Sequence, residues 1–216
     1  MHSAPDSPAT DRGRAREARA NDRAVLEAAR DVFAAQGFDA PTAAIARRAG
    51  VGVATVYRRY RSKDELVHAL RLLALEDVTR IAQDVAAERP PLAIGRFLVR
   101  HLQEAASPLA TTFGRLLPSS PEIEAASDRL RDALDHLIAL DRDRDLIPED
   151  YTAGEVMLAI AHLRPHLMVP RERATELHLR QLDLYLAGLR EVAQGRAKQR
   201  GAALTWDEWV SFNSAP

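Results

Sequence analysis

Apolar residues recur along most of this chain at intervals of three or four positions, and glycine or proline separates the resulting segments. That spacing places apolar side chains on one face of a helix. The pattern predicts helices over residues 22–36, 42–49, 53–60, 62–88, 92–106, 109–117, 122–140, 149–168 and 172–196, and a short one near 206–210. We therefore expect an all-α fold.

Two of the predicted helices are short and meet at a corner with two glycines. Thr42 can cap the first of them, and Gly50 can end it by adopting a left-handed conformation. Val51 can then pack inward and fix the angle of the corner. The inward positions of the first helix are Ile45, Ala46 and Ala49.

The second helix of this pair has the features of a helix that reads DNA. It buries Val56 and Tyr60, and small residues at its start would let the backbone approach base edges in the major groove. Its outward positions are Val53, Ala54, Thr55, Tyr57, Arg58 and Arg59. The alternative is a compact helical hairpin with no role in DNA binding.

The segment over about residues 20–70 resembles the DNA-binding domain of the TetR family of bacterial transcriptional regulators. The runs FAAQGFDAPTAAIARRAGV and VYRRYRSKDEL carry the resemblance, with agreement at Tyr57, Tyr60, Ser62, Lys63 and Leu66. It implies phosphate contacts from Thr42, Thr55, Tyr57, Arg59 and Lys63, and base-edge contacts from Ala43, Val53, Ala54 and Arg58. Arg59 stands where the family usually has histidine, so this contact would always be charged.

The distribution of charge supports this assignment better than the net charge does. The whole chain carries −1, whereas residues 1–75 hold 13 basic against 9 acidic side chains and the remainder is acidic. Cysteine is absent, which excludes disulfides and thiolate metal sites. No apolar run approaches the length of a membrane helix or of a secretion signal, so we expect a cytoplasmic protein without a membrane partner.

The breaks between the predicted helices and the shifts in composition divide the chain into four parts. Residues 1–20 are expected to form a disordered arginine-rich arm, which either follows DNA or is merely solvated. Residues 21–67 would form a three-helix DNA-binding domain of the helix-turn-helix type. A long helix from Ser62 would join it to a helical regulatory and dimerisation domain at 68–200, and residues 201–216 would form a tail.

The last two long helices are the expected surface of a homodimer, because apolar residues surround the first of them almost completely. The alternative is an intramolecular bundle. A two-fold axis would place two helix pairs in successive major grooves of a palindromic operator. The residues assigned to this interface are Met157, Ile160, Leu167, Leu182, Tyr185, Leu186 and Leu189.

The resemblance also implies a pocket for a small-molecule effector among the middle helices. Periodicity alone gives Phe97, His101, Phe113, Leu134, Met157 and His162 as candidates for its lining, and Arg100 or Arg164 at a rim would suit an anion. The segments LPSSPEIEAASDRLRDALDHLIAL and DLIPEDYTAGEVMLAIAHL resemble the regulatory domain of an SbtR-like subgroup.

Evidence for catalysis or metal binding is absent from the sequence. His162 and His166 share a helix face, but Pro165 lies between them and no dense carboxylate cluster is near, so we expect no metal, no cofactor and no enzyme activity. The two tryptophans, Trp206 and Trp209, are expected to dock on the chain's own core rather than on a partner.

The function expected from these patterns is that of a homodimeric repressor. It would bind double-stranded operator DNA and leave it when a small ligand binds. The competing hypothesis is a helical protein-interaction module without sequence-specific DNA binding, which would lack the steep salt dependence of phosphate contacts.

Overall fold

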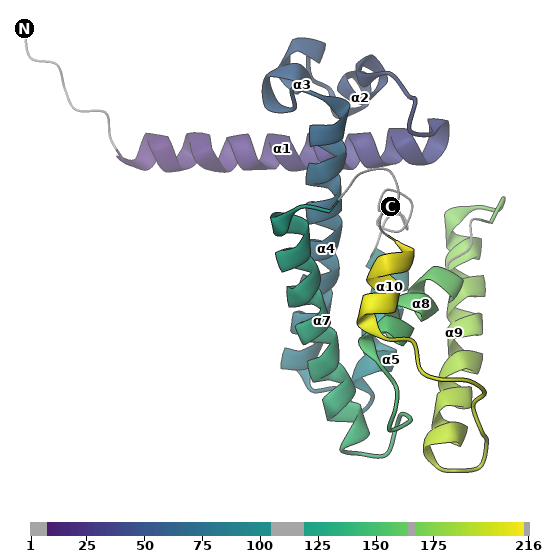
Figure 1. The fold of residues 1–216 in the computed structure, drawn as a ribbon. Helices are drawn as coiled ribbons and strands as arrows, with labels where there is room; N and C mark the ends of the chain where they lie inside the picture. Colours follow the sequence, from purple (N-terminus) through teal and green to yellow (C-terminus); the bar gives the residue numbers. More distant parts are fainter. Residues whose placement is uncertain (1–7, 105–118, 164–166, 214–216) are drawn as a thin grey trace, which may run out of the picture. The chain divides into compact units, whose positions relative to one another are not determined.

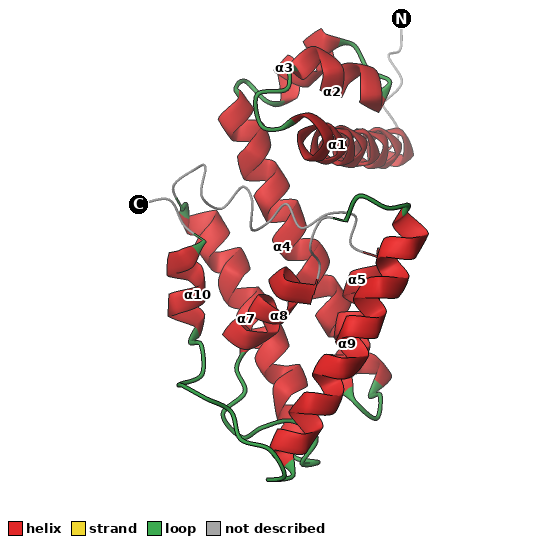
Figure 2. Cartoon of the chain, turned by 90° about the vertical axis from the view of Figure 1, so that its right-hand side faces the viewer, coloured by secondary structure: helices red, strands yellow, loops and turns green. Residues whose placement is uncertain are grey.

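The computed structural model describes residues 8–104, 119–163 and 167–213, with side chains from residue 22 onward. Every regular element within these ranges is a helix (Figures 1 and 2), which confirms the predicted fold class. The chain divides into two compact units, Met1–Leu70 and Arg71–Pro216. None of the helices in the described ranges combines the length and the apolarity needed to cross a bilayer.

The N-terminal unit contains α1 (Pro8–Gln36), α2 (Thr42–Ala49), α3 (Val53–Arg59) and the start of α4 (Lys63–Glu88). Helix α2 packs against both α1 and α3 (Figure 1). The fully or almost fully buried side chains of its interior include Val25, Val32, Phe33, Ile45, Val56, Leu66 and Val67. Ser62 caps α4, as the sequence predicts, because its hydroxyl accepts a hydrogen bond from the Glu65 amide at 3.1 Å.

Helix α1 is longer than the sequence pattern predicts. The pattern gives a start at residue 22 and disorder over residues 1–20, whereas the helix begins at Pro8. Residues 9–20 contain four alanines and four arginines, which are strong helix formers, and proline is well suited to the first position of a helix. Apolar periodicity is the signal of a buried face, so its absence from this segment does not exclude a helix.

The C-terminal unit contains the rest of α4 together with α5 (Ala93–Glu104), α7 (Pro121–Arg142), α8 (Ala153–Leu163), α9 (Arg171–Ala193) and α10 (Trp206–Phe212). Helix α5 packs against α7, α8 and α9, and α8 also packs against α10. Residues from all of these helices form one apolar core, whose largest fully buried members include Phe97, Leu130, Leu134, Tyr151 and Leu182. The helix predicted over 109–117 lies outside the described residues.

A carboxylate near the end of α7 caps the start of α5. Asp141 is fully buried, and its two oxygens accept hydrogen bonds from the amides of Ala93 and Ile94, both at 2.7 Å. Burial raises the pKa of Asp141, and the two amide donors oppose that rise. Both donors belong to the first turn of a helix, which has no internal acceptors for them, so Asp141 fixes α5 to α7.

The C-terminal segment crosses α8 at a glycine. A Cβ atom on Gly154 would lie 2.6 Å from the Leu204 carbonyl oxygen and 2.7 Å from that of Thr205. The Thr152 hydroxyl donates to the same Leu204 carbonyl at 2.5 Å. The segment therefore lies directly on the backbone of α8, where only glycine leaves room for it.

Helix α10 begins immediately after this crossing. Thr205 and Glu208 form a reciprocal capping box, in which each side chain accepts from the other residue's amide. Trp209 is only 8% exposed and belongs to the core, and Trp206 and Val210 pack against that core. The tryptophans thus dock on their own chain, as the sequence favours.

Replacing Asp141 with alanine would leave two buried amides without acceptors. We expect Asp141→Ala to lower the free energy of unfolding by about 3 kcal/mol. Urea denaturation followed by circular dichroism measures this change. Asp143→Ala is the matched control, because Asp143 is exposed and lies two residues away, and its effect should stay within about 0.5 kcal/mol. An equal decrease in the free energy of unfolding for both variants would show that Asp141 does not hold the start of α5.

Adding a methyl group at Gly154 should displace the C-terminal segment. We expect Gly154→Ala to cost about 2 kcal/mol, because two backbone carbonyls must move. Since Trp206 and Trp209 are the two tryptophans of the chain, their emission should also shift to longer wavelength. Gly52→Ala is the control: its new methyl group would meet only the Thr55 hydroxyl oxygen at 3.8 Å, in the unit without tryptophans, so it should leave the emission unchanged. If the tryptophan emission of Gly154→Ala is not shifted, the C-terminal segment does not lie on the backbone of α8 at this glycine.

Candidate functional site

The corner between α2 and α3 has the geometry that the glycines predict. Gly50 is left-handed, with φ of 69°, and its amide donates to the Arg47 carbonyl at 3.4 Å. The next amide, that of Val51, donates to the Ala46 carbonyl at 3.0 Å. This pair of bonds satisfies carbonyls at the end of α2 and turns the chain toward α3.

The predicted cap at Thr42 is wrong. Thr42 is the first residue of α2, and the preceding Pro41 occupies the cap position without any side-chain hydrogen bond. Proline supplies the extended conformation that this position needs, with φ of −72° and ψ of 143°, so the helix begins one residue earlier than a Thr42 cap would require. Thr42 is half-buried, and its neighbour Ala43 is exposed.

Helix α3 exposes most of its surface. Val56 is the one fully buried residue among its seven, and Tyr57 and Val53 are 52% and 39% exposed. Ala54 and Arg58 are exposed as well, so the outward positions predicted from the sequence are outward in the structure, with Thr55 and Arg59 half-buried. Tyr60, expected to be buried, is half-buried just after the helix, and desolvation raises its pKa.

The cations around α3 have different partners within the N-terminal unit. Arg58 donates to the Thr55 hydroxyl at 3.0 Å, on the exposed side of the same helix. Arg59 forms an ion pair with Asp22 of α1. The Lys63 ammonium lies over the rings of Phe38 and Phe33, at 4.6 and 5.5 Å from their centroids.

These contacts give Arg59 and Lys63 a second role that the sequence did not reveal. Both attach the α3–α4 segment to α1 or to the residues just after it, through charge in one case and through aromatic faces in the other. A third contact, from Arg48 to Asp31 at 2.8 Å, ties α2 to α1. Among the polar side chains of α3, Tyr57 and Arg58 are the exposed ones.

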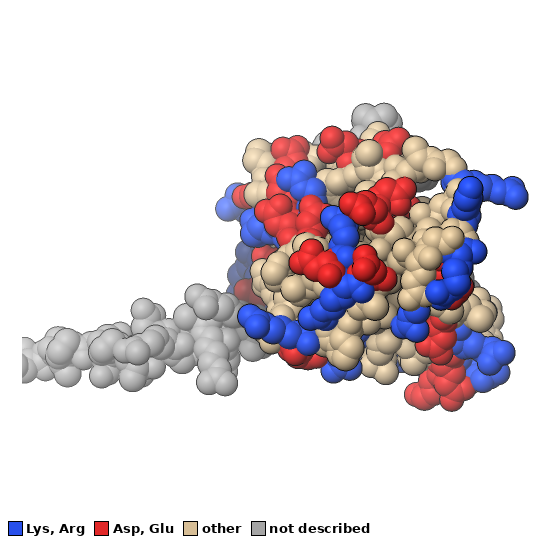
Figure 3. All heavy atoms as spheres, turned by 90° about the horizontal axis from the view of Figure 1, so that it is seen from below, with Lys and Arg blue, Asp and Glu red and all other residues tan. Residues whose placement is uncertain are grey.

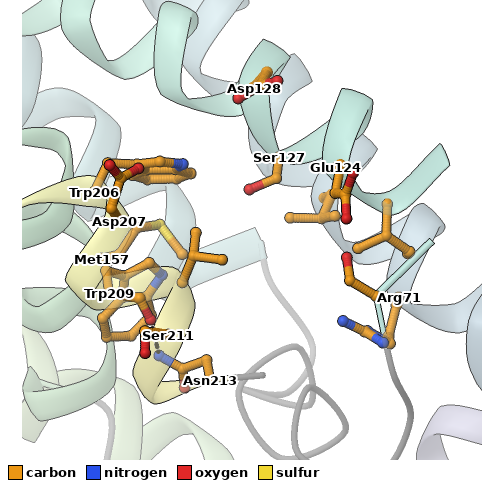
Figure 4. A pocket seen from close by; sticks show the side chains of 14 residues that line it. Arg71, Glu124, Ser127, Asp128, Met157, Trp206, Asp207, Trp209, Ser211 and Asn213 are labelled. Carbon is orange, nitrogen blue, oxygen red and sulfur yellow. Dashed lines mark hydrogen bonds between the residues drawn. The ribbon is translucent and has the colours of Figure 1, made fainter. Parts of the chain in front are cut away.

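A separate cavity of about 480 Å³ lies within the C-terminal unit (Figure 4). Figure 4 shows Trp206, Met157 and Trp209 on one side, with Ser127 and Glu124 of α7 opposite them and Arg71 of α4 near Glu124. Leu75, Ile123 and Val210 add apolar surface to the lining.

Of the six residues predicted to line a pocket, Met157 is the one that contacts this cavity within the described part of the chain. Phe97, His101 and Leu134 are buried in the solid core, His162 is exposed, and Phe113 lies outside the described residues, as does His166. Periodicity identifies which face of a helix turns inward, but it does not distinguish close-packed core from the wall of a cavity. The occurrence of both tryptophans in one short segment, residues 206–209, is the sequence signal that could have located the cavity.

Arg100 does not lie at the cavity rim, where the sequence suggested a contact with an anion. Its guanidinium binds Glu88 and Glu104, both at 2.9 Å, and Asp84 at 3.7 Å. These acids raise the pKa of Arg100, with the hydrogen bond to Glu104 as the largest cause. Arg164, the other rim candidate, lies outside the described residues. On the face shown in Figure 3, acidic and basic side chains are likewise intermingled.

The predicted dimer residues lie mostly inside their own unit. Met157, Ile160, Leu182 and Leu189 are buried in its core, so their assignment to a subunit interface is wrong. Leu167, Tyr185 and Leu186 are half-buried, and the Tyr185 hydroxyl lies 2.8 Å from that of Tyr151. Burial raises the pKa of Tyr185 to about 12.

The structure instead exposes the opposite faces of α8 and α9. Leu158 is 48% exposed and Leu184 is 63% exposed. Ala161 on α8, and Gln181, Ala187 and Gly188 on α9, are the exposed neighbours of these leucines along each helix. The most apolar stripe of each helix packs on its own core, which leaves this second face for another contact.

Comparisons with known proteins agree with this architecture. Residues 25–70 match the family model described as bacterial regulatory proteins, tetR family. A TetR transcription regulatory protein from Mycobacterium vanbaalenii is 26% identical, with a TM-score of 0.58 over 81% of this chain and 98% of that one. The TetR transcriptional regulator SCO0520 from Streptomyces coelicolor is 27% identical, with a TM-score of 0.59 over 78% and 98%.

Proposed function

We propose that this chain, whose N-terminal unit is a tetR-family domain and whose fold is that of TetR-family transcriptional regulators, binds a palindromic DNA operator as a homodimeric repressor. The observation that carries the proposal is the exposed face of α3, held by the left-handed turn at Gly50. A short helix that buries a single residue fully contributes little to the core of its unit. Its exposed face is therefore available for binding, and its dimensions suit the major groove of DNA.

Two classes of contact to DNA follow from the exposed positions. Val53, Ala54 and Arg58 on α3, with Ala43 on α2, would meet base edges and determine sequence preference. Thr42, Thr55, Tyr57, Arg59 and Lys63 would meet the phosphate backbone. A phosphate would compete with Asp22 for Arg59, so Arg59 should contribute less to DNA affinity than its charge alone implies.

The homodimer would form through the exposed faces of α8 and α9. Leu158 and Leu184 are large apolar side chains in contact with water, and the small residues beside Leu184 would let a second helix approach closely. Open space at Gly188 supports this, since a Cβ atom at that position would meet no other segment of the described chain within 4 Å. Two-fold symmetry would bring each such face against its copy.

A small ligand in the cavity of the C-terminal unit would control DNA binding. Arg71 and Leu75 of the lining belong to α4, the helix whose first residues lie in the N-terminal unit. A ligand that favours one position of α4 over another would shift the population of conformers that fit the operator.

Selection of bound fragments from a random pool of double-stranded DNA tests the operator proposal. We expect a palindrome to be enriched. Tyr57→Ala should then weaken binding about tenfold on every enriched sequence, because it removes a phosphate hydrogen bond. Arg58→Ala should instead change which sequences are preferred. Arg129→Ala, an exposed cation of α7 in the other unit, is the control and should alter neither property.

Salt dependence separates this proposal from a protein-interaction module. Binding through several phosphates should fall steeply as salt rises, and Lys63→Ala should reduce the logarithmic slope by about one. Affinity that does not respond to salt, or a pool without any enriched sequence at low salt, would favour the interaction module.

A charge on the exposed face of α9 should dissociate the dimer. Leu184→Glu would place two carboxylates near the symmetry axis in water-excluded surface, so we expect the dissociation constant to rise at least about a hundredfold. Sedimentation velocity measures the change, and circular dichroism verifies that the variant is folded. Phe212→Glu is the control, because Phe212 is a comparably exposed apolar residue on α10, and this variant should remain dimeric. A dimeric Leu184→Glu protein would place the interface elsewhere.

A further inference from the structure

The cavity in the C-terminal unit has a lining of unusual composition for this chain. Its two tryptophans, Trp206 and Trp209, both contribute to the wall. Trp209 is buried and Trp206 is half-buried, and the thioether of Met157 lies near them (Figure 4). Two indoles and a thioether give a polarisable surface that suits an aromatic or alkyl body and, on an indole face, a cation.

The charged groups of the lining are mainly acidic. Glu124 and Asp128 come from α7 and Asp207 from α10, whereas Arg71 is the only basic residue that the described part of the chain contributes. Arg71 is buried and already interacts with another group of the protein. Asp128 has a 3.4 Å contact with Arg131, and Glu124 and Asp207 have no ion pair among the described residues. The lining thus holds three carboxylates and one guanidinium, and the carboxylates of Glu124 and Asp207 are available to a charged ligand.

The aromatic and acidic groups meet at one end of the cavity. Figure 4 shows Ser127 of α7 pointing toward the Trp206 ring, with Asp128 next to Ser127 farther along α7 and Asp207 next to Trp206 on α10. Arg71 lies away from this end, near Glu124. A cation at the Trp206 end would have an indole face and two carboxylates around it, and an apolar body could extend toward Met157 and Trp209.

We propose that this cavity binds an amphiphilic organic cation, a substituted ammonium group that carries an aromatic or alkyl body. The cation would lie against Trp206 between Asp207 and Asp128, and the body would fill the space beside Met157 and Trp209. This inference rests on the proposed ligand-controlled function, because it names the chemical class of the effector. An anion at the same end would face carboxylates from two helices and would be disfavoured.

The tryptophans provide a direct measurement of occupancy, since all tryptophan emission of the chain comes from the cavity wall. Full-length protein should be titrated with phenylbutyl-trimethylammonium, phenylbutanol and phenylbutyrate, which share one apolar body and differ in charge. We expect the cation to bind about tenfold more tightly than the alcohol, and the carboxylate to bind most weakly.

Charge-removing variants locate the cation within the cavity. Asp207→Asn and Asp128→Asn should each weaken the ammonium compound about threefold to fivefold and leave the alcohol unaffected. Trp206→Leu should weaken it by a similar factor while Trp209 still reports the binding. Asp132→Asn is the matched control, because Asp132 is exposed on α7 one turn beyond Asp128 and does not line the cavity.

The outcomes separate this inference from the proposed function. Tighter binding of the carboxylate, equal binding of all three compounds, or no change in emission with any of them would overturn the ligand class. DNA binding is measured on the same protein without ligand, so a selected operator would still stand in each of these cases. Conversely, cation binding that is about threefold to fivefold weaker in each of the two aspartate variants would support the inference even for a protein that selects no DNA.

Discussion

An all-helical chain must satisfy the backbone groups that each helix leaves unpaired at its two ends, and this protein meets that constraint differently in its two units. In the N-terminal unit the solution is local: the left-handed Gly50 folds its own amide and the next one back onto α2. In the C-terminal unit it is non-local, since Asp141 reaches the first amides of α5 from α7, 47 and 48 residues along the chain. The positions of neighbouring helices depend on these hydrogen bonds at the helix ends, because a helix that is fixed at one end can pack on its neighbours in few ways.

The charged residues around α3 also serve two purposes. Arg59 and Lys63 stabilise the N-terminal unit through Asp22 and through the rings of Phe33 and Phe38. Any ligand that binds them must share or replace those contacts, whereas Tyr57 extends from the helix with half of its surface exposed. Positions that brace a domain and positions that contact its ligand are thus neighbours here, and a loss of binding on mutation can arise from either cause.

The features that depend on local physics could be predicted from the sequence. Helix periodicity located α4, α5, α7 and α9 to within a few residues, and the need for positive φ located Gly50. Prediction failed where the outcome depends on which neighbour a helix meets. Periodicity assigns the apolar stripe with Leu182 and Leu189 to a partner subunit, but the chain's own core buries it. The cavity could not be predicted for the same reason, because its walls come from four helices far apart in sequence.

The crossing at Gly154 has a consequence for how sequences of this kind can vary. A side chain at that position and a C-terminal segment along this path exclude each other, because the new atom would overlap two carbonyl oxygens. A homologue that lacks the segment has no steric need for glycine at this position. A homologue with any other residue there must have a segment that follows a different path or must lack the segment. The constraint acts in one direction: a residue other than glycine at this position near the start of α8 indicates a homologue in which no C-terminal segment follows this path.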